Sequence, residues 1–175
     1  SEREERRDAK RQDVRVAAGR PSLHARRRTR GGAAVHGHSC ARRTDNSVVC
    51  WGLNDDGECG DGTIAQKHYA TPINATNLNA ATDIAAGNHH TCAVKADGTA
   101  WCWGSGTKGK LGTNSTSNSM TPAQVKGPGG SGFLTSVAQI VAGDSHTCAR
   151  KTDGTVWCWG DDDFGQVGNN VVTTT

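Results

Sequence analysis

From about residue 38 onward, short runs of apolar and β-branched residues alternate with polar, glycine-rich stretches. The pattern is clearest in the middle of the chain, where the apolar run 82–87 is followed by segments 91–95 and 99–103, which are rich in Thr, Val and Trp. Short segments of this kind, bounded by glycine and other turn residues, predict β-strands. A fourth strand is expected around 123–125, directly after a Thr-Pro pair.

The same order of motifs occurs three times. His-Thr-Cys-Ala, Asp-Gly-Thr and Trp-Cys-Trp-Gly follow one another from His90 and again from His146, and a degenerate copy starts at His38. Self-similarity at a long period predicts a repeat architecture. A repeating unit of about four short strands is typical of a propeller blade. We therefore expect an all-β fold, a partial β-propeller of about three four-stranded blades.

The repeats divide the chain into four parts. A basic lead-in, expected to be disordered or irregular, covers 1–34, and a degenerate first repeat covers 35–79. The second repeat covers 80–135, and a third, truncated repeat covers 136–175. The innermost strand of the first repeat is in doubt, because no apolar run precedes His38.

A three-residue loop joins the second and third strands of each unit. In the second unit it is 96–98, and Gly98 supplies the left-handed backbone that its last position requires. With Asp97 at the apex, Cys92 lies opposite Cys102. The turn residues predicted in this way are Asp45, Asn46, Asp97, Gly98, Asp153 and Gly154. The opposed cysteines are Cys40 with Cys50, Cys92 with Cys102, and Cys148 with Cys158.

Directly opposed cysteines on antiparallel strands are close enough for a disulfide. Free thiols are one alternative, and zinc bound by His90, Cys92 and Cys102 is another. Zinc is disfavoured because each blade lacks a fourth ligand, so we expect neither a metal nor another cofactor. Paired cysteines in every unit favour an oxidising compartment, and the expected location is extracellular or in the cell envelope.

The seventh cysteine and the tryptophans are expected to pack. Cys59 occupies the position of Leu111 and Val167, which predicts a small buried apolar residue, with a reactive or intermolecular thiol as the alternative. Alternate residues of a strand share one face, so the two tryptophans of a strand point away from its cysteine. The expected packing residues are Trp51, Trp101, Trp103, Trp157 and Trp159, and one member of each pair is expected to pack between blades.

The net charge of +3 conceals an uneven distribution. Residues 1–34 hold 11 Lys/Arg against 5 Asp/Glu, whereas residues 35–175 hold 9 against 12. Binding of nucleic acid is therefore expected only through the arginine-rich segment 1–34, if at all. The sequence has no apolar run of the roughly 18 residues that a membrane span requires.

Five elements recur in phase in the repeats. In the second unit these elements are Ala86-Gly87, His90-Thr91, Asp97-Gly98, Trp103-Gly104 and Gly109-Lys110-Leu111-Gly112. Their order resembles the regulator of chromosome condensation (alpha-tubulin suppressor-like) repeat family. The paired cysteines resemble the bacterial branch of this family, whose members are often exported. The resemblance implies a seven-bladed propeller for a full-length member, so we expect this chain to be a fragment.

No motif in the sequence indicates catalysis. Residues 104–110 match a phosphate-loop pattern, but such a loop opens a helix, and the two copies of this stretch lose the lysine. We therefore expect a non-enzymatic scaffold that binds a protein partner through the loops that vary between repeats, 61–79, 113–120 and 126–135. The alternatives are a guanine-nucleotide exchange factor or chromatin-associated regulator of a small GTPase, and a binding module of a larger enzyme.

Overall fold

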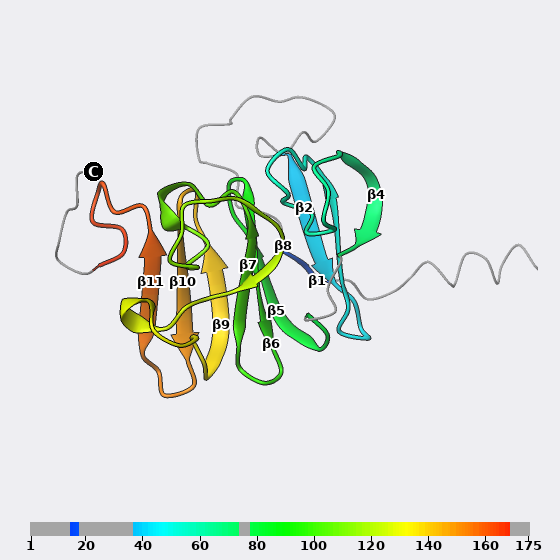
Figure 1. The fold of residues 1–175 in the computed structure, drawn as a ribbon. Coiled ribbons are helices and arrows are strands. Elements are labelled where there is room, and N and C mark those ends of the chain that lie inside the picture. Colours follow the sequence, from blue (N-terminus) through cyan, green and yellow to red (C-terminus); the bar gives the residue numbers. More distant parts are fainter. Residues whose placement is uncertain (1–14, 18–36, 74–77, 169–175) are drawn as a thin grey trace, which may run out of the picture.

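The computed structural model describes residues 15–17, 37–73 and 78–168. These residues form three antiparallel sheets, which we call blades 1, 2 and 3 (Figure 1). Blade 1 contains β1 (Arg15–Ala17), β2 (His38–Arg42), β3 (Val48–Gly52) and β4 (Lys67–Pro72). Blade 2 contains β5 (Ala81–Ala86), β6 (His90–Lys95), β7 (Ala100–Gly104) and β8 (Ser119–Gln124). Blade 3 contains β9 (Val137–Ala142), β10 (His146–Lys151) and β11 (Val156–Gly160).

Within each blade the strands pair in chain order, as expected when every connection is short. Two 3₁₀ turns, η1 (Thr107–Gly109) and η2 (Pro128–Gly130), lie in the loops of blade 2. Strand β5 lies against β2, and β9 lies against β5 and β6, so that the blades are stacked side by side (Figure 1). The predicted all-β fold, a partial propeller, is confirmed.

The hairpin register follows from the turn. Cys40 pairs with Cys50, Cys92 with Cys102 and Cys148 with Cys158, and each pair forms a disulfide. The last turn residue of each hairpin has a left-handed backbone, with φ of 64° at Asn46, 76° at Gly98 and 85° at Gly154.

The side chain of the aspartate at the apex of each turn accepts hydrogen bonds from the residue two positions further along the chain. Oδ1 of Asp97 accepts hydrogen bonds from the backbone N–H (3.0 Å) and from Oγ1 (2.6 Å) of Thr99. These bonds favour the carboxylate and lower the pKa of Asp97 to about 2. Asp45 and Asp153 accept the same pair of bonds from Ser47 and Thr155, and their pKa values are also lowered.

The first blade contains a strand that the sequence does not predict. Strand β1 lies within the segment expected to be disordered, and it pairs with β2 with Ala17 opposite Cys40. The other residues of segment 1–34 lie outside the described part of the chain. β1 thus stands beside β2 where β5 stands beside β6 in blade 2.

The core lies mainly between the blades. One cluster joins Cys40, Val48 and Cys50 of blade 1 to Ile84 and Trp103 of blade 2. A second cluster joins residues of blades 2 and 3, and its members include Cys92, Leu111, Val125, Leu134, Val137 and Ile140. Each blade therefore buries apolar surface against its neighbour, which suits a chain with few large aliphatic residues. In the part of the chain that the structure describes, no helix has the length and apolar character to cross a membrane.

Candidate functional site: a groove between blades 2 and 3

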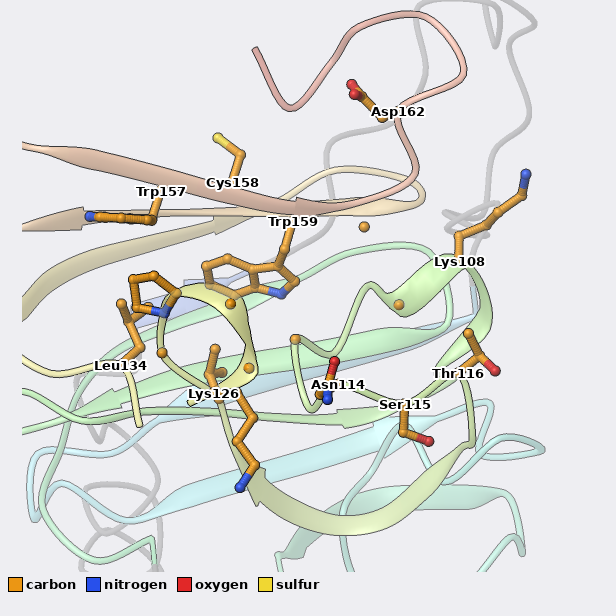
Figure 2. A pocket seen from close by; sticks show the side chains of 18 of the residues that line it. Lys108, Asn114, Ser115, Thr116, Lys126, Leu134, Trp157, Cys158, Trp159 and Asp162 are labelled. Atoms are coloured by element: carbon orange, nitrogen blue, oxygen red, sulfur yellow. The ribbon is translucent and has the colours of Figure 1, made fainter. Parts of the chain in front are cut away.

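Each blade has two different faces, because successive side chains of a strand point in opposite directions. Figure 2 shows the indoles of Trp157 and Trp159 on one side of β11 and the side chain of Cys158 on the other. We call these sides the tryptophan face and the disulfide face. The tryptophan face of a blade meets the preceding blade, and the disulfide face meets the following one.

A repeated set of hydrogen bonds joins the blades. The carbonyl oxygen of Glu58 in blade 1 accepts bonds from Nε1 of Trp103 (2.8 Å) and Oγ1 of Thr91 (3.0 Å). Nε2 of His38 lies 2.9 Å from the same Thr91 hydroxyl.

The junction between blades 2 and 3 has the same contacts. Trp159 and Thr147 donate to the carbonyl oxygen of Lys110 at 3.0 Å and 2.9 Å, and Nε2 of His90 lies 2.9 Å from Oγ1 of Thr147. Burial lowers the pKa of His90 to about 3, so that its ring is neutral at pH 7. These hydrogen bonds fix the position of each blade relative to its neighbour, and with it the position of the loops that the blade carries.

A groove of about 850 Å³ lies at the outer side of the second junction. The loops that vary most between repeats line it, through residues 114–116 and 126–130 of blade 2. Trp157 and Trp159 of β11 form the opposite wall, and their indoles face the groove (Figure 2). Two of the three loops predicted to bind a partner therefore meet at one site.

Part of the groove lining is apolar. Val125 and Leu134 contribute to its lining and are buried beneath it. Trp159 is held in place by its bond to Lys110, whereas Trp157 is 38% exposed. The groove therefore offers an aromatic surface to a solute or to a partner's side chain.

Charged groups stand at the margins of the groove. Nζ of Lys108 lies 3.0 Å from Oδ2 of Asp163 and 3.8 Å from Oδ1 of Asp161, and the contacts raise the pKa of Lys108. Nζ of Lys126 lies 4.4 Å from the centre of the Phe133 ring. A lining that combines apolar and aromatic side chains with a few polar groups is typical of sites that bind peptides or small molecules.

The described residues of the third variable loop, 61–73 and 78–79, do not line this groove. Nδ2 of Asn54 donates to the carbonyl oxygens of Thr63 (2.9 Å) and Ala65 (3.0 Å), and Lys67 pairs with Asp61. These contacts fix the first half of the loop against blade 1. Residues 74–77 lie outside the described part of the chain.

A second polar cluster lies at the junction of blades 1 and 2. Nδ1 of His89 lies 2.9 Å from Oε1 of the fully buried Glu58 and 3.3 Å from Oδ2 of Asp56. These residue types can ligate a metal ion. The other oxygen of each carboxylate is held by the fold, since Oε2 of Glu58 accepts the N–H of Asp56 (2.9 Å) and Oδ1 of Asp56 accepts a bond from Asn118 (2.7 Å). The cluster is a polar contact that joins blade 1 to blade 2.

Sequence reasoning missed this cluster because its members come from two repeats. At the corresponding positions of the next junction stand Lys108, Lys110 and Ser145, so that no repeated motif marks it. A search for charged residues that differ between copies of the repeat could have found it.

Cys59 is fully buried, as its position in the repeat predicts. Burial is the main cause that raises the pKa of its thiol to about 12, and Asp61 and Glu58 add to the effect. Among the described residues it is the one cysteine outside a disulfide. The thiol of Cys59 is therefore protonated at neutral pH and shielded from solvent.

Comparison with known proteins decides the family. Residues 45–94 and 97–150 match the regulator of chromosome condensation (RCC1) repeat, and a second description of this repeat matches residues 81–110 and 137–166. The chain belongs to the regulator of chromosome condensation repeat family. The blades described above are thus RCC1 repeats, and the resemblance expected from the motifs is confirmed.

Relatives of this RCC1 repeat chain include much longer proteins. The human E3 ubiquitin-protein ligase HERC2 is 34% identical over 140 residues, which cover 77% of this chain and 3% of that protein. The Arabidopsis thaliana ultraviolet-B receptor UVR8 is 32% identical over 132 residues, which cover 75% of this chain and 29% of the receptor. The chain therefore spans only a small part of the length of these relatives.

Solved structures share the fold of the RCC1 repeats. Yeast RCC1 (Prp20), in its complex with Kap60, has a TM-score of 0.71 and 20% identity, covering 92% of this chain and 35% of that one. Human WBSCR16 has a TM-score of 0.67 and 21% identity, covering 79% and 35%. At these identities the likeness concerns the fold alone.

Proposed function

We propose that this chain is a non-catalytic module that binds a protein partner, and that the groove between blades 2 and 3 receives an extended segment of that partner. One observation carries the proposal: two loops that differ between repeats meet the exposed indole of Trp157 across the groove. Loops on a rigid scaffold commonly carry binding, and tryptophan is enriched among the residues that dominate interface energies.

The relatives give further support for a binding role. Crystallographic work on Prp20p from Saccharomyces cerevisiae concerns its binding to Gsp1p and histones, and the yeast protein has also been crystallised with Kap60. The ligase relatives match this chain in a small part of their length, which favours a second arrangement, a binding module within a larger enzyme. In both arrangements the repeats bind and do not catalyse.

We also propose that the chain works in an oxidising compartment, outside the cell or in its envelope. The three hairpin disulfides support this location, because such bonds persist where thiols are not kept reduced. A thiol count on protein extracted from its native host tests the proposal. One free thiol supports it, and seven free thiols contradict it.

The groove is tested with a library of displayed random peptides, selected on the immobilised chain. Peptides selected on the wild type are expected to bind Trp157→Ala at least about tenfold more weakly, a loss of about 1.4 kcal/mol. Tyr69→Ala is the matched control, because Tyr69 lies on β4 of blade 1 and is 83% exposed. Selected peptides that bind Trp157→Ala as tightly as the wild type contradict the proposed site.

A further inference from the structure

The carboxyl group of Glu58, fully buried at the junction of blades 1 and 2, offers more than the fold requires. Its Oε2 accepts the backbone N–H of Asp56 at 2.9 Å, in the turn that follows β3. In blade 3 an amide makes the same bond, since Oε1 of Gln166 accepts the N–H of Phe164 at 2.8 Å. The fold therefore needs one acceptor oxygen at this position, and it needs neither a charge nor a second oxygen.

The second oxygen of Glu58, Oε1, converges with two other atoms that can ligate a metal. It lies 2.9 Å from Nδ1 of His89, which in turn lies 3.3 Å from Oδ2 of Asp56, and the three atoms are all within 4.8 Å of one another. Within the described part of the chain, Nδ1 is the one polar partner of both oxygens. A single nitrogen carries at most one proton for two carboxylates, and buried charges are otherwise paired or bound to a metal.

A lysine near the cluster does not pair with either carboxylate. Nζ of Lys110 donates to the carbonyl oxygen of Asn88 at 3.0 Å, and no ion pair of Lys110 occurs among the residues that the structure describes. Burial lowers the pKa of Lys110, and the charges of Asp56, Glu58 and Asp144 oppose this effect at longer range. The two converging oxygens are thus left without a direct lysine or arginine partner.

Both carboxylates are held in orientation from the side away from His89. Oδ1 of Asp56 accepts a bond from Nδ2 of Asn118 at 2.7 Å, as Oε2 of Glu58 does from the backbone. Outer bonds of this kind orient the ligands of metal sites. The side chains of His89 and Asp56 are 38% and 32% exposed, so that an ion can enter from solvent and retain water.

We propose that Asp56, Glu58 and His89 bind one zinc ion and so join blade 1 to blade 2. Zinc takes imidazole nitrogen and carboxylate oxygen at about 2.0–2.2 Å in a tetrahedron, which places neighbouring ligand atoms about 3.4 Å apart. The separations of 2.9 Å and 3.3 Å are close to this spacing. Water fills the fourth position. Calcium, which takes about six to eight oxygen ligands at longer distances, fits this set less well.

These ligands differ from the zinc candidates that the sequence suggests. Cys92 and Cys102 form a disulfide, and Nε2 of His90 lies 2.9 Å from Oγ1 of Thr147. The proposed ion uses instead the residue before His90, together with two residues of the preceding blade. None of its ligands lines the groove between blades 2 and 3, so the failure of either proposal leaves the other untouched.

Calorimetric titration of zinc chloride into the oxidised chain, freed of metal by a chelator, tests the proposal. The wild type is expected to bind one zinc ion tightly. Glu58→Gln removes a ligand charge and retains an acceptor for the N–H of Asp56, as Gln166 shows in blade 3. His89→Ser removes the imidazole and introduces the residue that blade 3 has there, Ser145. Each variant is expected to bind zinc at least about tenfold more weakly, because it lacks one of three ligands.

His68→Ser is the matched control, because His68 lies on β4 and is exposed. It is expected to bind zinc like the wild type. Zinc is also expected to raise the midpoint of thermal unfolding of the wild type and the control more than that of the two ligand variants, because an ion bound to the folded state stabilises it. Circular dichroism establishes that every variant is folded. A wild type that binds no zinc overturns the proposal and leaves a hydrogen-bonded contact. Folded ligand variants that bind zinc like the wild type overturn it equally, because the ion then lies elsewhere.

Discussion

Nε1 of Trp103 donates a 2.8 Å hydrogen bond to the carbonyl oxygen of Glu58 and so joins blade 2 to blade 1. Trp159 makes the same bond, at 3.0 Å, to Lys110. Trp103 is fully buried, whereas Trp159 is half-buried beside the groove. The two bonds join equivalent atoms, and the main difference between them is the solvation of the indole.

Replacing each indole by phenylalanine compares the two bonds. Trp103→Phe is expected to lower the free energy of unfolding by about 1–3 kcal/mol, because the lost bond and the smaller ring act in a dry interface. Trp159→Phe is expected to cost less, because water from the groove can reach the Lys110 carbonyl. Urea denaturation followed by far-ultraviolet circular dichroism measures both. Equal losses would show that burial does not set the strength of this bond.

The hairpin glycines are expected to differ in their tolerance of a side chain. Both Gly98 and Gly154 have positive φ, so alanine at either position costs about 1–2 kcal/mol from backbone strain. At Gly98 a Cβ would also lie 3.2 Å from the backbone of Ser136, whereas at Gly154 it meets no described residue within 4 Å. Gly98→Ala should thus destabilise the protein more than Gly154→Ala, as thermal unfolding of the two variants will show. Asn46→Gly serves as the control, because glycine relieves the strain of a positive φ while it removes the bond that Oδ1 of Asn46 accepts from Arg42, so its net effect should be smaller than that of either alanine variant.

Acid is expected to weaken the hairpin turns. The pKa of Asp97 is lowered from 3.8 to about 2, chiefly by its bond from the Thr99 hydroxyl and by Lys95. A depressed carboxyl pKa contributes stability that is present above pH 3.8 and is lost as the pH falls toward 2. Asp97→Asn should reduce the loss of stability across this window, measured by urea midpoints at stepped pH values. An unchanged acid dependence would mean that other carboxyl groups dominate it.

The thiol of Cys59 is expected to be inert in the folded protein. Iodoacetamide should label no cysteine in the native, oxidised chain and one cysteine after denaturation, as counted by mass spectrometry. Because burial raises the pKa of this thiol from 9.0 to about 12, the folded state favours its neutral form. Its contribution to stability is complete below pH 9.0 and is lost as the pH rises toward 12. Rapid labelling of the native chain at neutral pH would contradict this account.

The blades could be predicted because their determinants are local. A three-residue loop fixes hairpin register, and Asp97 with Gly98 defines such a loop, so the facing of Cys92 and Cys102 follows by counting. The side to which each tryptophan points follows from strand alternation. Because the motif is repeated, the same argument holds for each of the other hairpins.

Contacts that depend on how the blades stack could not be predicted. A residue pattern cannot reveal the role of the carbonyl oxygen of Glu58, which is the acceptor at the first junction. The groove lies between the loop around η2 and Trp157, and no repeat period encodes that arrangement. Strand β1 carries no repeat motif, and only its pairing with β2 identifies it.

The position of the disulfides has a mechanical consequence. Each bond spans a sequence separation of 10 and closes on its own hairpin, so none of the three ties one blade to another. Under a pulling force, the stack would come apart at the junctions while every covalent loop stayed shut. Each disulfide-closed loop keeps about 35 Å of chain from being extended, and a reductant added during the pulling experiment would release that length. The oxidation state of the cysteines thus determines the maximum extension of this protein, and the side chains at the junctions determine the force needed to separate the blades.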